Sequence, residues 1–330
     1  MSTSDLNQLC RRLLRHRNDA IGVALATKLI DAYQALSVES RYEFYDILLK
    51  EYDADTQRIV AAARAYEQNP GFKSHQALVK TVETPRQRLF RSINMAPGGT
   101  FSLVKMREDL VQQETPRRVR LRAVEQDLRQ LLQSWFNRGF LHVQRIDWDS
   151  PASLLERIIS HEAVHQIKGW DDLRRRLKQD RRCFAFFHPS MNNEPLVFVE
   201  IALTDGIPRA IEPLIARDAP VRDEQQADTA IFYSISNCQT GLRGVSFGGF
   251  LIKQVVDELT RELRQLRTFA TLSPVPSFMK WLTQQVGDGD ESNTVVQEAT
   301  YVQQSFGQDP QWFEDPQRRD SLRNPLMHLC

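Results

Sequence analysis

The chain has 330 residues, a length that favours two domains, and its 41% hydrophobic content is enough for each domain to bury a core. Its 43 basic and 42 acidic side chains leave a net charge of +1, which excludes a general attraction to nucleic acid or to an anionic membrane. No run of about 18 apolar residues occurs, so the sequence predicts no membrane span.

The four cysteines, Cys10, Cys183, Cys238 and Cys330, are scattered and form no C-x-x-C pair. In a chain of this length the pattern indicates reduced thiols in a reducing compartment, so the expected location is the cytoplasm. The N-terminal segment is rich in arginine but has no apolar core, so a secretory signal is not expected and a transit peptide is the minor alternative.

Residues 1–138 are predicted to form an all-helical domain, because apolar residues recur at helical spacing along this half. Helices are expected over residues 42–52 and 117–135. The sequences N-P-G at 69–71 and A-P-G-G at 96–99 separate neighbouring helices. Such a bundle more often holds subunits together or supports a site than carries out chemistry.

Residues 139–330 are predicted to form an α/β domain. Short β-type runs occur at 183–188, 196–203, 230–236 and 267–272. The first two runs are close enough to form a hairpin, and an amphipathic helix over residues 247–265 precedes the last run. The order strand, strand, strand, helix, strand predicts a mixed sheet with a crossover helix.

A glycine-rich turn joins the third strand to the long helix, with the sequence G-L-R-G-V-S-F-G-G over residues 241–249. Glycines let the backbone approach a ligand, and the start of a helix presents free N–H groups and a positive dipole end to a phosphate. The turn is therefore a candidate pyrophosphate site. The alternative is a turn whose glycines only permit tight packing.

Two further residues near strand ends are candidates for chemistry. Ser273 follows the last strand in T-L-S-P-V-P, where two prolines would hold it rigidly at an edge at which α/β sheets bind ligands. The residues alone favour a turn or capping serine. Cys238 is a candidate nucleophile by its location, although a small buried thiol is the favoured interpretation.

His161-Glu-Ala-Val-His165 matches the H-E-x-x-H pattern of zinc proteases, in which both histidines share one face of a helix. No third ligand follows at the spacing of known zinc sites, so we expect no bound metal, and instead partly buried polar residues on a helix that packs on the sheet. The basic run from Arg174 to Arg182 is expected to be a solvated helix face. Local positive charge for a phosphorylated ligand is the alternative.

Taken together, these motifs resemble the malonyl-CoA decarboxylase family. The matching stretches keep their order and spacing between about residues 86 and 282. They are NMAPGGTFSLVKMREDL at 94–110, HEAVH at 161–165, CFAFFHPSMNNEPLVFVEIALT at 183–204, AIFYSIS at 230–236, GLRGVSFGGFLIKQVVDEL at 241–259 and TLSPVPSFMKWL at 271–282. The resemblance implies a helical domain over residues 1–138 that forms homo-oligomers, and an acetyltransferase-like (GNAT-like) catalytic domain over residues 139–330.

The resemblance also implies the activity: malonyl-CoA is converted to acetyl-CoA and carbon dioxide through an enolate. The thioester is the electron sink, so no metal or organic cofactor is expected, and fixed donors would stabilise the enolate before carbon is protonated. Catalysis is assigned to Ser273 together with a histidine. Binding of malonyl-CoA is assigned to Gly244, Ser246, Phe247, Gly248 and Gly249.

Two departures from the family pattern concern this site. Some members carry a glutamate where this chain has Ser246, and no N-F-H-L-x-N-G-like segment with the family's catalytic histidine is found. The last histidine, His328, is expected on a helix surface, so the chain is expected to lack the C-terminal part of the catalytic domain. Two alternatives stay open, a non-catalytic protein that binds CoA thioesters or supports assembly, and an acyltransferase on the same scaffold.

Overall fold

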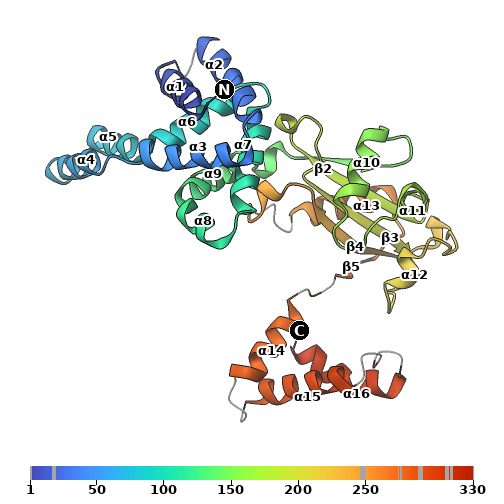
Figure 1. The fold of residues 1–330 in the computed structure, drawn as a ribbon. Helices are drawn as coiled ribbons and strands as arrows, with labels where there is room; N and C mark the ends of the chain where they lie inside the picture. The colour runs from blue at the N-terminus through green and yellow to red at the C-terminus, as the bar shows by residue number, and fades with distance from the viewer. Residues whose placement is uncertain are drawn as a thin grey trace. The chain divides into compact units, whose positions relative to one another are not determined.

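The computed structural model describes residues 2–16, 20–245, 250–273, 275, 277–288, 293–308, 312 and 315–329. The chain forms two compact units, Met1–Leu272 and Ser273–Cys330. The first unit combines a helical part with a mixed sheet, and the second is helical (Figure 1). The predicted boundary at residue 138 falls inside the first unit, where helices and sheet share apolar contacts.

The helical part follows the predicted apolar periodicity. Its helices are α1 (Thr3–Arg15), α2 (Ala20–Gln34), α3 (Val38–Glu51), α4 (Thr56–Gln68), α5 (Phe72–Val82), α6 (Pro85–Asn94), α7 (Gly99–Val111), α8 (Thr115–Arg120) and α9 (Arg122–Trp135). The helical segment predicted over residues 117–135 is present, but it is divided into α8 and α9 because the chain leaves the helical conformation at Leu121 (φ −88°, ψ 9°). The side chain of Leu121 is buried in the helical core, which anchors this break.

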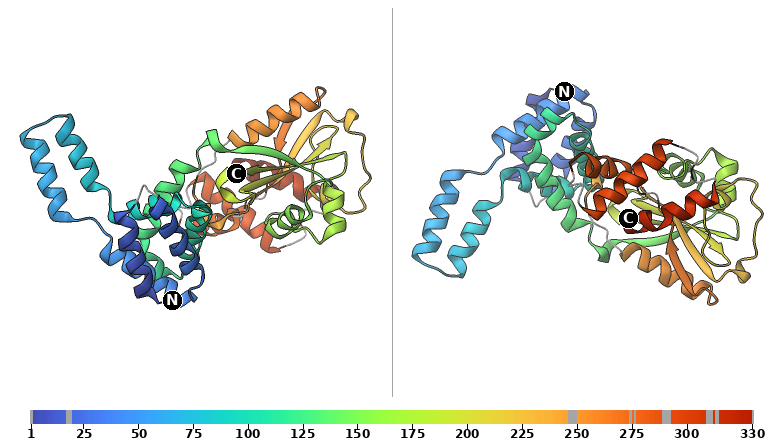
Figure 2. Two further views of the ribbon diagram at one scale, coloured as in Figure 1. Left: turned by 90° about the horizontal axis from the view of Figure 1, so that it is seen from above. Right: turned by 90° about the horizontal axis from the view of Figure 1, so that it is seen from below.

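The hairpin α4–α5 extends away from the other helices of this part, as both views of Figure 2 show. Neither helix contains a buried residue. Apolar side chains on it are exposed, including Val60, Phe72 and Val79. The hairpin is therefore an arm that contributes little to the core of its own unit.

The sheet has the predicted mixed topology. Its strands are β1 (His142–Ile146), β2 (Arg181–Phe187), β3 (Val197–Thr204), β4 (Thr229–Asn237) and β5 (Thr268–Thr271), in the order β1-β2-β3-β4-β5. The first four strands pair antiparallel, β2 and β3 form the predicted hairpin, and β5 pairs parallel to β4 after the crossover helix α13 (Phe250–Glu262).

Helices cover both faces of the sheet. On one face Leu251, Val255 and Leu259 of α13 pack with apolar residues of β2, β3 and β4. The other face is covered by α10 (Ala152–His161) and α11 (Trp170–Arg176). Because β2 and β3 are enclosed by these layers, every residue in them is buried, which explains why most of their residues are apolar.

Two irregularities occur along β4. The register of β3 and β4 shifts between Glu200 and Ile201, which leaves Tyr233 as an extra residue on β4. In addition β5 is short and pairs with β4 only as far as Phe232. Within the described part of the chain, the residues of β4 beyond Phe232 therefore have no strand beside them on the β5 side.

The remaining elements are a short helix in the first unit, α12 (Glu212–Ile215), and three helices of the second unit, α14 (Phe278–Asp288), α15 (Thr294–Gln308) and α16 (Pro316–Leu329). The helices of the second unit pack around a small core of their own. Its buried members are Leu282, Ala299, Val302 and Leu322.

Candidate functional site

A cavity of about 340 Å³ lies where β4 ends and its edge is unpaired. Its wall comes from the last residues of β4, from the turn that follows and from the segment after α10. The lining residues are Ala163, Leu196, Ile235, Ser236, Asn237, Gln239, Thr240, Leu242, Arg243, Gly244 and Val245. This volume is in the range of small-molecule sites, so the cavity is a candidate ligand site in the unit.

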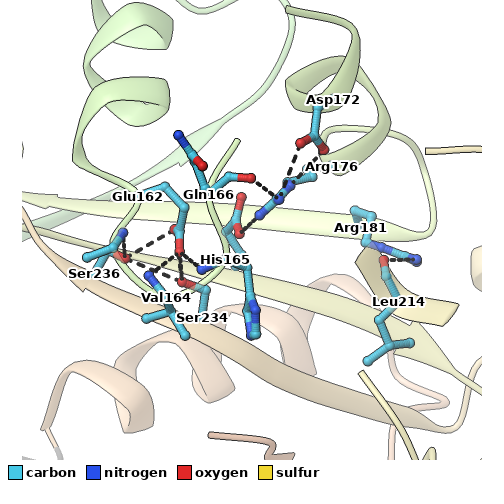
Figure 3. Close-up of polar contacts among 12 residues, drawn as sticks. Glu162, Val164, His165, Gln166, Asp172, Arg176, Arg181, Leu214, Ser234 and Ser236 are labelled. Carbon is cyan, nitrogen blue, oxygen red and sulfur yellow. Dashed lines mark hydrogen bonds and ion pairs between the residues drawn. The ribbon is translucent and has the colours of Figure 1, made fainter. Parts of the chain in front are cut away.

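Glu162 is the acceptor at the centre of a polar network behind this cavity (Figure 3). Its carboxylate accepts hydrogen bonds from the backbone N–H groups of Val164 (2.8 Å) and His165 (2.7 Å). It also accepts from the hydroxyl groups of Ser234 (2.8 Å) and Ser236 (3.1 Å) on β4. These donors join the segment after α10 to the end of β4, and they balance the cost of burying the carboxylate.

Ser236 connects this hydrogen-bond network to the cavity wall. Its hydroxyl donates to Glu162 and its oxygen accepts from the backbone N–H of Ala163 at 3.2 Å. Both Ser236 and Ala163 line the cavity. The hydrogen bonds therefore fix the polar groups of the wall and hold a carboxylate directly behind it.

The helix expected for the H-E-x-x-H sequence is not present, so that prediction is wrong. Helix α10 ends at His161, and the following residues form a loop. The side chain of Glu162 explains why the helix ends, because its carboxylate accepts hydrogen bonds from the backbone N–H groups of Val164 and His165, which follow it in the loop. Among the described residues no group of three or more His, Cys, Asp or Glu side chains could hold a metal ion.

The basic run is not a solvated face, which corrects a second prediction. Arg175, Arg176, Arg181 and Arg182 are buried, and only the other cations of the run are exposed. Their partners are Asp180 for Arg175 (2.9 Å) and Arg181 (2.9 Å), Asp172 (3.0 Å) and Glu200 (2.8 Å) for Arg176, and Glu224 (2.6 Å) and Glu262 (2.7 Å) for Arg182. These guanidinium groups hold α11 and the loops on the sheet and are not available to a phosphate.

Glu200 is the most perturbed carboxyl group of this network. It is fully buried on β3, and Arg176 is its hydrogen-bond donor. Burial raises the pKa of Glu200 to about 8, the neighbouring charge of Glu162 acts in the same direction, and Arg176 opposes both. Close to neutral pH this carboxyl group therefore binds a proton that an exposed glutamate would not.

Cys238 is the buried thiol that the sequence favoured over a nucleophile. It is 6% exposed, and burial raises its thiol pKa far above the ordinary value. A thiol attacks as the thiolate, so Cys238 is a poor nucleophile in this environment.

The glycine-rich turn divides into positions with different roles. A Cβ on Gly241 would lie 2.0 Å from the carbonyl oxygen of Val104 on α7, so this glycine permits close packing. Gly244 has a φ of +75° and lines the cavity. The positions Ser246, Phe247, Gly248 and Gly249, named for CoA binding, lie outside the described residues.

Two arginines of the helical part hold this turn in place. Arg107, on α7, donates to the carbonyl oxygens of Gly241 (2.6 Å) and Arg243 (2.8 Å). Arg129, on α9, donates to the carbonyl oxygen of Gly244 (3.1 Å). The helical part therefore fixes the backbone that forms one wall of the cavity.

Ser273 is the first residue of the second unit and is exposed. It follows Leu272, whose backbone N–H donates to the carbonyl oxygen of Phe232 on β4 at 2.9 Å. The structure thus places Ser273 directly after the last contact of β5 with β4. His328 lies on the exposed face of α16, where its Nδ1 is 2.6 Å from Oε2 of Glu298.

Comparison with known proteins gives a match over nearly the whole chain. Residues 52–136 match the malonyl-CoA decarboxylase N-terminal domain and residues 139–330 match the malonyl-CoA decarboxylase C-terminal domain. The chain belongs to the malonyl-CoA decarboxylase family. Its sequence is 32% identical to the mitochondrial malonyl-CoA decarboxylase of Anser anser anser over 92% of this chain, and 37% identical to that of Mus musculus over 74%.

Solved structures of malonyl-CoA decarboxylases share the fold. The structure from Rhodopseudomonas palustris is 44% identical, has a TM-score of 0.89 and is matched over 100% of this chain and 80% of its own. That from Agrobacterium vitis is 43% identical with a TM-score of 0.84, over 97% of this chain and 77% of its own. The chain spans 66% of the goose relative and 54% of the mouse relative.

The structure adds residues to the site of this family member that the sequence did not single out. Ser236 and Arg243 line the cavity, and Glu162, Arg107 and Arg129 hold its walls. Glu162 lies inside the H-E-x-x-H match, so its position was visible but its role was not. No local pattern marks the two arginines, because their partners are more than 100 positions away. Across the described helices, none is long and apolar enough to span a bilayer.

Proposed function

We propose that this chain binds malonyl-CoA and converts it to acetyl-CoA and carbon dioxide. The observation that carries the proposal is membership of the malonyl-CoA decarboxylase family, with 44% identity to the Rhodopseudomonas palustris protein across the whole chain. The cavity at the end of β4 supports it, because a glycine-rich turn beside a cavity of this size suits a phosphorylated thioester.

In this proposal the turn between β4 and α13 binds the CoA part of the substrate. Gly244, Ser246, Phe247, Gly248 and Gly249 would let the backbone approach the pyrophosphate, as the family resemblance implies. Gly244 supports this role, since its φ of +75° is a conformation that side chains oppose. We propose that the sheet and its crossover helix form the family's acetyltransferase-like (GNAT-like) domain within residues 139–330.

The chemistry requires little beyond fixed hydrogen-bond donors. The bond between the carboxyl carbon and C2 of the malonyl group breaks, carbon dioxide leaves, and the electron pair moves into the thioester carbonyl to give an enolate. A proton then returns to C2 and forms the acetyl group. We propose that Ser273 works with a histidine in holding the malonyl group and in proton delivery, and that the thioester itself supplies the electron sink, without a metal or organic cofactor.

Assembly and location are part of the same proposal. We propose that residues 1–138 mediate homo-oligomerisation, supported by the arm α4–α5, whose apolar side chains are exposed in the single chain. We propose that a second copy of this chain packs against these exposed side chains of the arm. We also propose a cytoplasmic location, supported by Cys10, Cys183 and Cys238, which are free and buried thiols.

The test is a parallel assay of carbon dioxide and acetyl-CoA from malonyl-CoA, with no acyl acceptor present. We expect Ser273→Ala to lower turnover by orders of magnitude while CoA binding stays within about threefold. The matched control is Ser277→Ala, four residues later in the same segment and also exposed, which should keep turnover.

A chimera tests whether the activity depends on a part of the family's sequence that this chain does not cover. It appends the part of the Rhodopseudomonas palustris protein that this chain does not cover. Turnover in the natural chain supports the proposal, and turnover in the chimera alone would show that the activity requires the appended part. Binding of malonyl-CoA by both without carbon dioxide release would replace it with a CoA-binding function, and release only with an acyl acceptor would favour an acyltransferase.

A further inference from the structure

A second hollow, of about 520 Å³, lies on the helical side of the glycine-rich turn. We call it the arginine groove, because five arginines line it together with one acidic residue. They are Arg107, Arg118, Arg122, Arg129, Arg243 and Glu125. These side chains come from α7, α8, α9 and the turn after β4, so the positive charge gathers from four separate segments.

The charge of this groove is not neutralised by the protein. Glu125 is committed to Arg107, with its Oε1 at 2.7 Å from Nη2 and 2.9 Å from Nε. Within the described part of the chain, the guanidinium groups of Arg118, Arg122 and Arg243 have no carboxylate within ion-pair distance. Five arginines against one glutamate leave a local excess of positive charge in a chain whose net charge is only +1.

The arginines also influence one another. Arg107 is 2% exposed, and burial lowers the pKa of its guanidinium, while Glu125 opposes that effect. The nearby charges of Arg129 and Arg118 lower it further. Positive charges that line one groove repel each other. An anion in the groove would therefore weaken this repulsion and also add a favourable attraction.

The groove adjoins the cavity at the end of β4. Arg243 and Gly244 line both hollows. A ligand that reaches across Gly244 would therefore place its acyl end in the cavity and its phosphorylated end in the groove. A CoA thioester has this form, since a long neutral arm joins the acyl group to an adenosine diphosphate with a 3′-phosphate.

We propose that the arginine groove binds the phosphorylated adenosine end of the CoA thioester, with Arg118 and Arg122 as its main phosphate contacts. The inference rests on the proposed function and adds to it a role in substrate binding for the helical part. Guanidinium groups suit this role, because their planar fork matches two phosphate oxygens and keeps its charge at any physiological pH.

The test uses adenosine 3′,5′-bisphosphate as the probe, which carries the phosphates without a thioester. Titration calorimetry on the full chain should show binding that weakens about tenfold in Arg118→Gln and Arg122→Gln, since each loses a charge-assisted contact. Arg118→Lys and Arg122→Lys should recover part of the affinity. The matched control is Arg120→Gln, also on α8, whose guanidinium pairs with Asp46 at 2.8 Å outside the groove. Thermal melting of each variant verifies folding.

The outcomes separate this inference from the proposed function. Weaker probe binding in the groove variants, with no decarboxylation by any form, would support the groove and reject the activity. Decarboxylation with unchanged probe affinity in these variants would reject the groove alone. Absence of probe binding by the natural chain, or equal displacement of the probe by heparin and by RNA, would also overturn the inference.

Discussion

The Nη1 atom of Arg176 lies 2.8 Å from Oε2 of Glu200, and both side chains are almost fully shielded from solvent. Glu200 belongs to β3, the middle strand of the sheet, and Arg176 ends α11. The same guanidinium pairs with Asp172 at 3.0 Å, so one cation serves two buried carboxyl groups. This arrangement ties α11 to the sheet beside the network that supports the candidate site.

Arg176→Met should destabilise the first unit by about 3–5 kcal/mol, because Asp172 and Glu200 lose their shared donor while they stay buried. Denaturant unfolding followed by circular dichroism measures the loss. Arg174→Met is the matched control on the same helix, where the exposed guanidinium stacks on Trp148, 4.5 Å from the ring centroid. A loss below 1 kcal/mol in Arg176→Met would contradict the structural role given to this pair.

The stability of the chain should fall as the pH rises toward 8, and Glu200 should be the cause. Its pKa is raised to about 8 in the folded chain, against 4.5 for an ordinary glutamate. Between these values the folded state holds a proton that the unfolded state has released, so the contribution is favourable at low pH and is lost as the pH rises. The slope can approach about 1.4 kcal/mol per pH unit.

Glu200→Gln tests this assignment because the amide cannot titrate. Unfolding free energies of both proteins at pH 5.5, 7.0 and 8.5 should show a steeper decline for the natural chain. The difference between the two then isolates the contribution of Glu200 from that of the other titrating groups. Parallel curves for the two proteins would show that Glu200 keeps an ordinary pKa.

Glu162→Gln should destabilise the first unit by about 2–4 kcal/mol. The carboxylate accepts hydrogen bonds from two hydroxyl groups and two backbone N–H groups. In glutamine an NH₂ group replaces one of the two oxygens, so some of these donors would face another donor in place of an acceptor. Thermal unfolding measures the effect, with Glu156→Gln as the exposed control on α10. Equal stability of the two variants would mean that the network contributes nothing.

Local sequence patterns predicted most of the fold because they reflect burial. The mostly apolar sequences of β2 and β3 and the apolar stripe on α13 arise from the layers that enclose these elements. The edge strand β1 was missed, since most of its residues are exposed and its sequence H-V-Q-R-I has no apolar alternation. Leu121 lies inside the predicted helical segment, because its apolar character fits either a helix stripe or the break that the structure shows.

The polar parts of the site were harder to predict, because their partners are distant in sequence. Glu162, the residue after α10, accepts hydrogen bonds from Ser234 and Ser236, which lie more than 70 positions later. In the sequence the buried arginines resemble an exposed basic run, because their acidic partners, such as Glu262, come from other parts of the chain. Gly244 belongs to the predicted glycine-rich turn and its role in CoA binding stays a prediction, whereas no local pattern marks the arginines around it.

Gly244→Ala should weaken CoA binding and lower stability by about 1–2 kcal/mol. The residue has a φ of +75°, a conformation that costs a side chain about that much. A Cβ would also lie 3.3 Å from Nη2 of Arg129, which holds the carbonyl oxygen of Gly244. Movement of that guanidinium would loosen the wall shared by the cavity and the arginine groove.

The control is Gly139→Ala, where a Cβ would meet only the Asn137 side chain at 3.4 Å and φ is not in the left-handed region. Titration with CoA and thermal unfolding should separate the two variants, with Gly139→Ala close to the natural chain in both. If Gly244→Ala lost stability but kept its affinity for CoA, Gly244 would be a structural glycine, and the proposed path of the ligand across it would have to be abandoned.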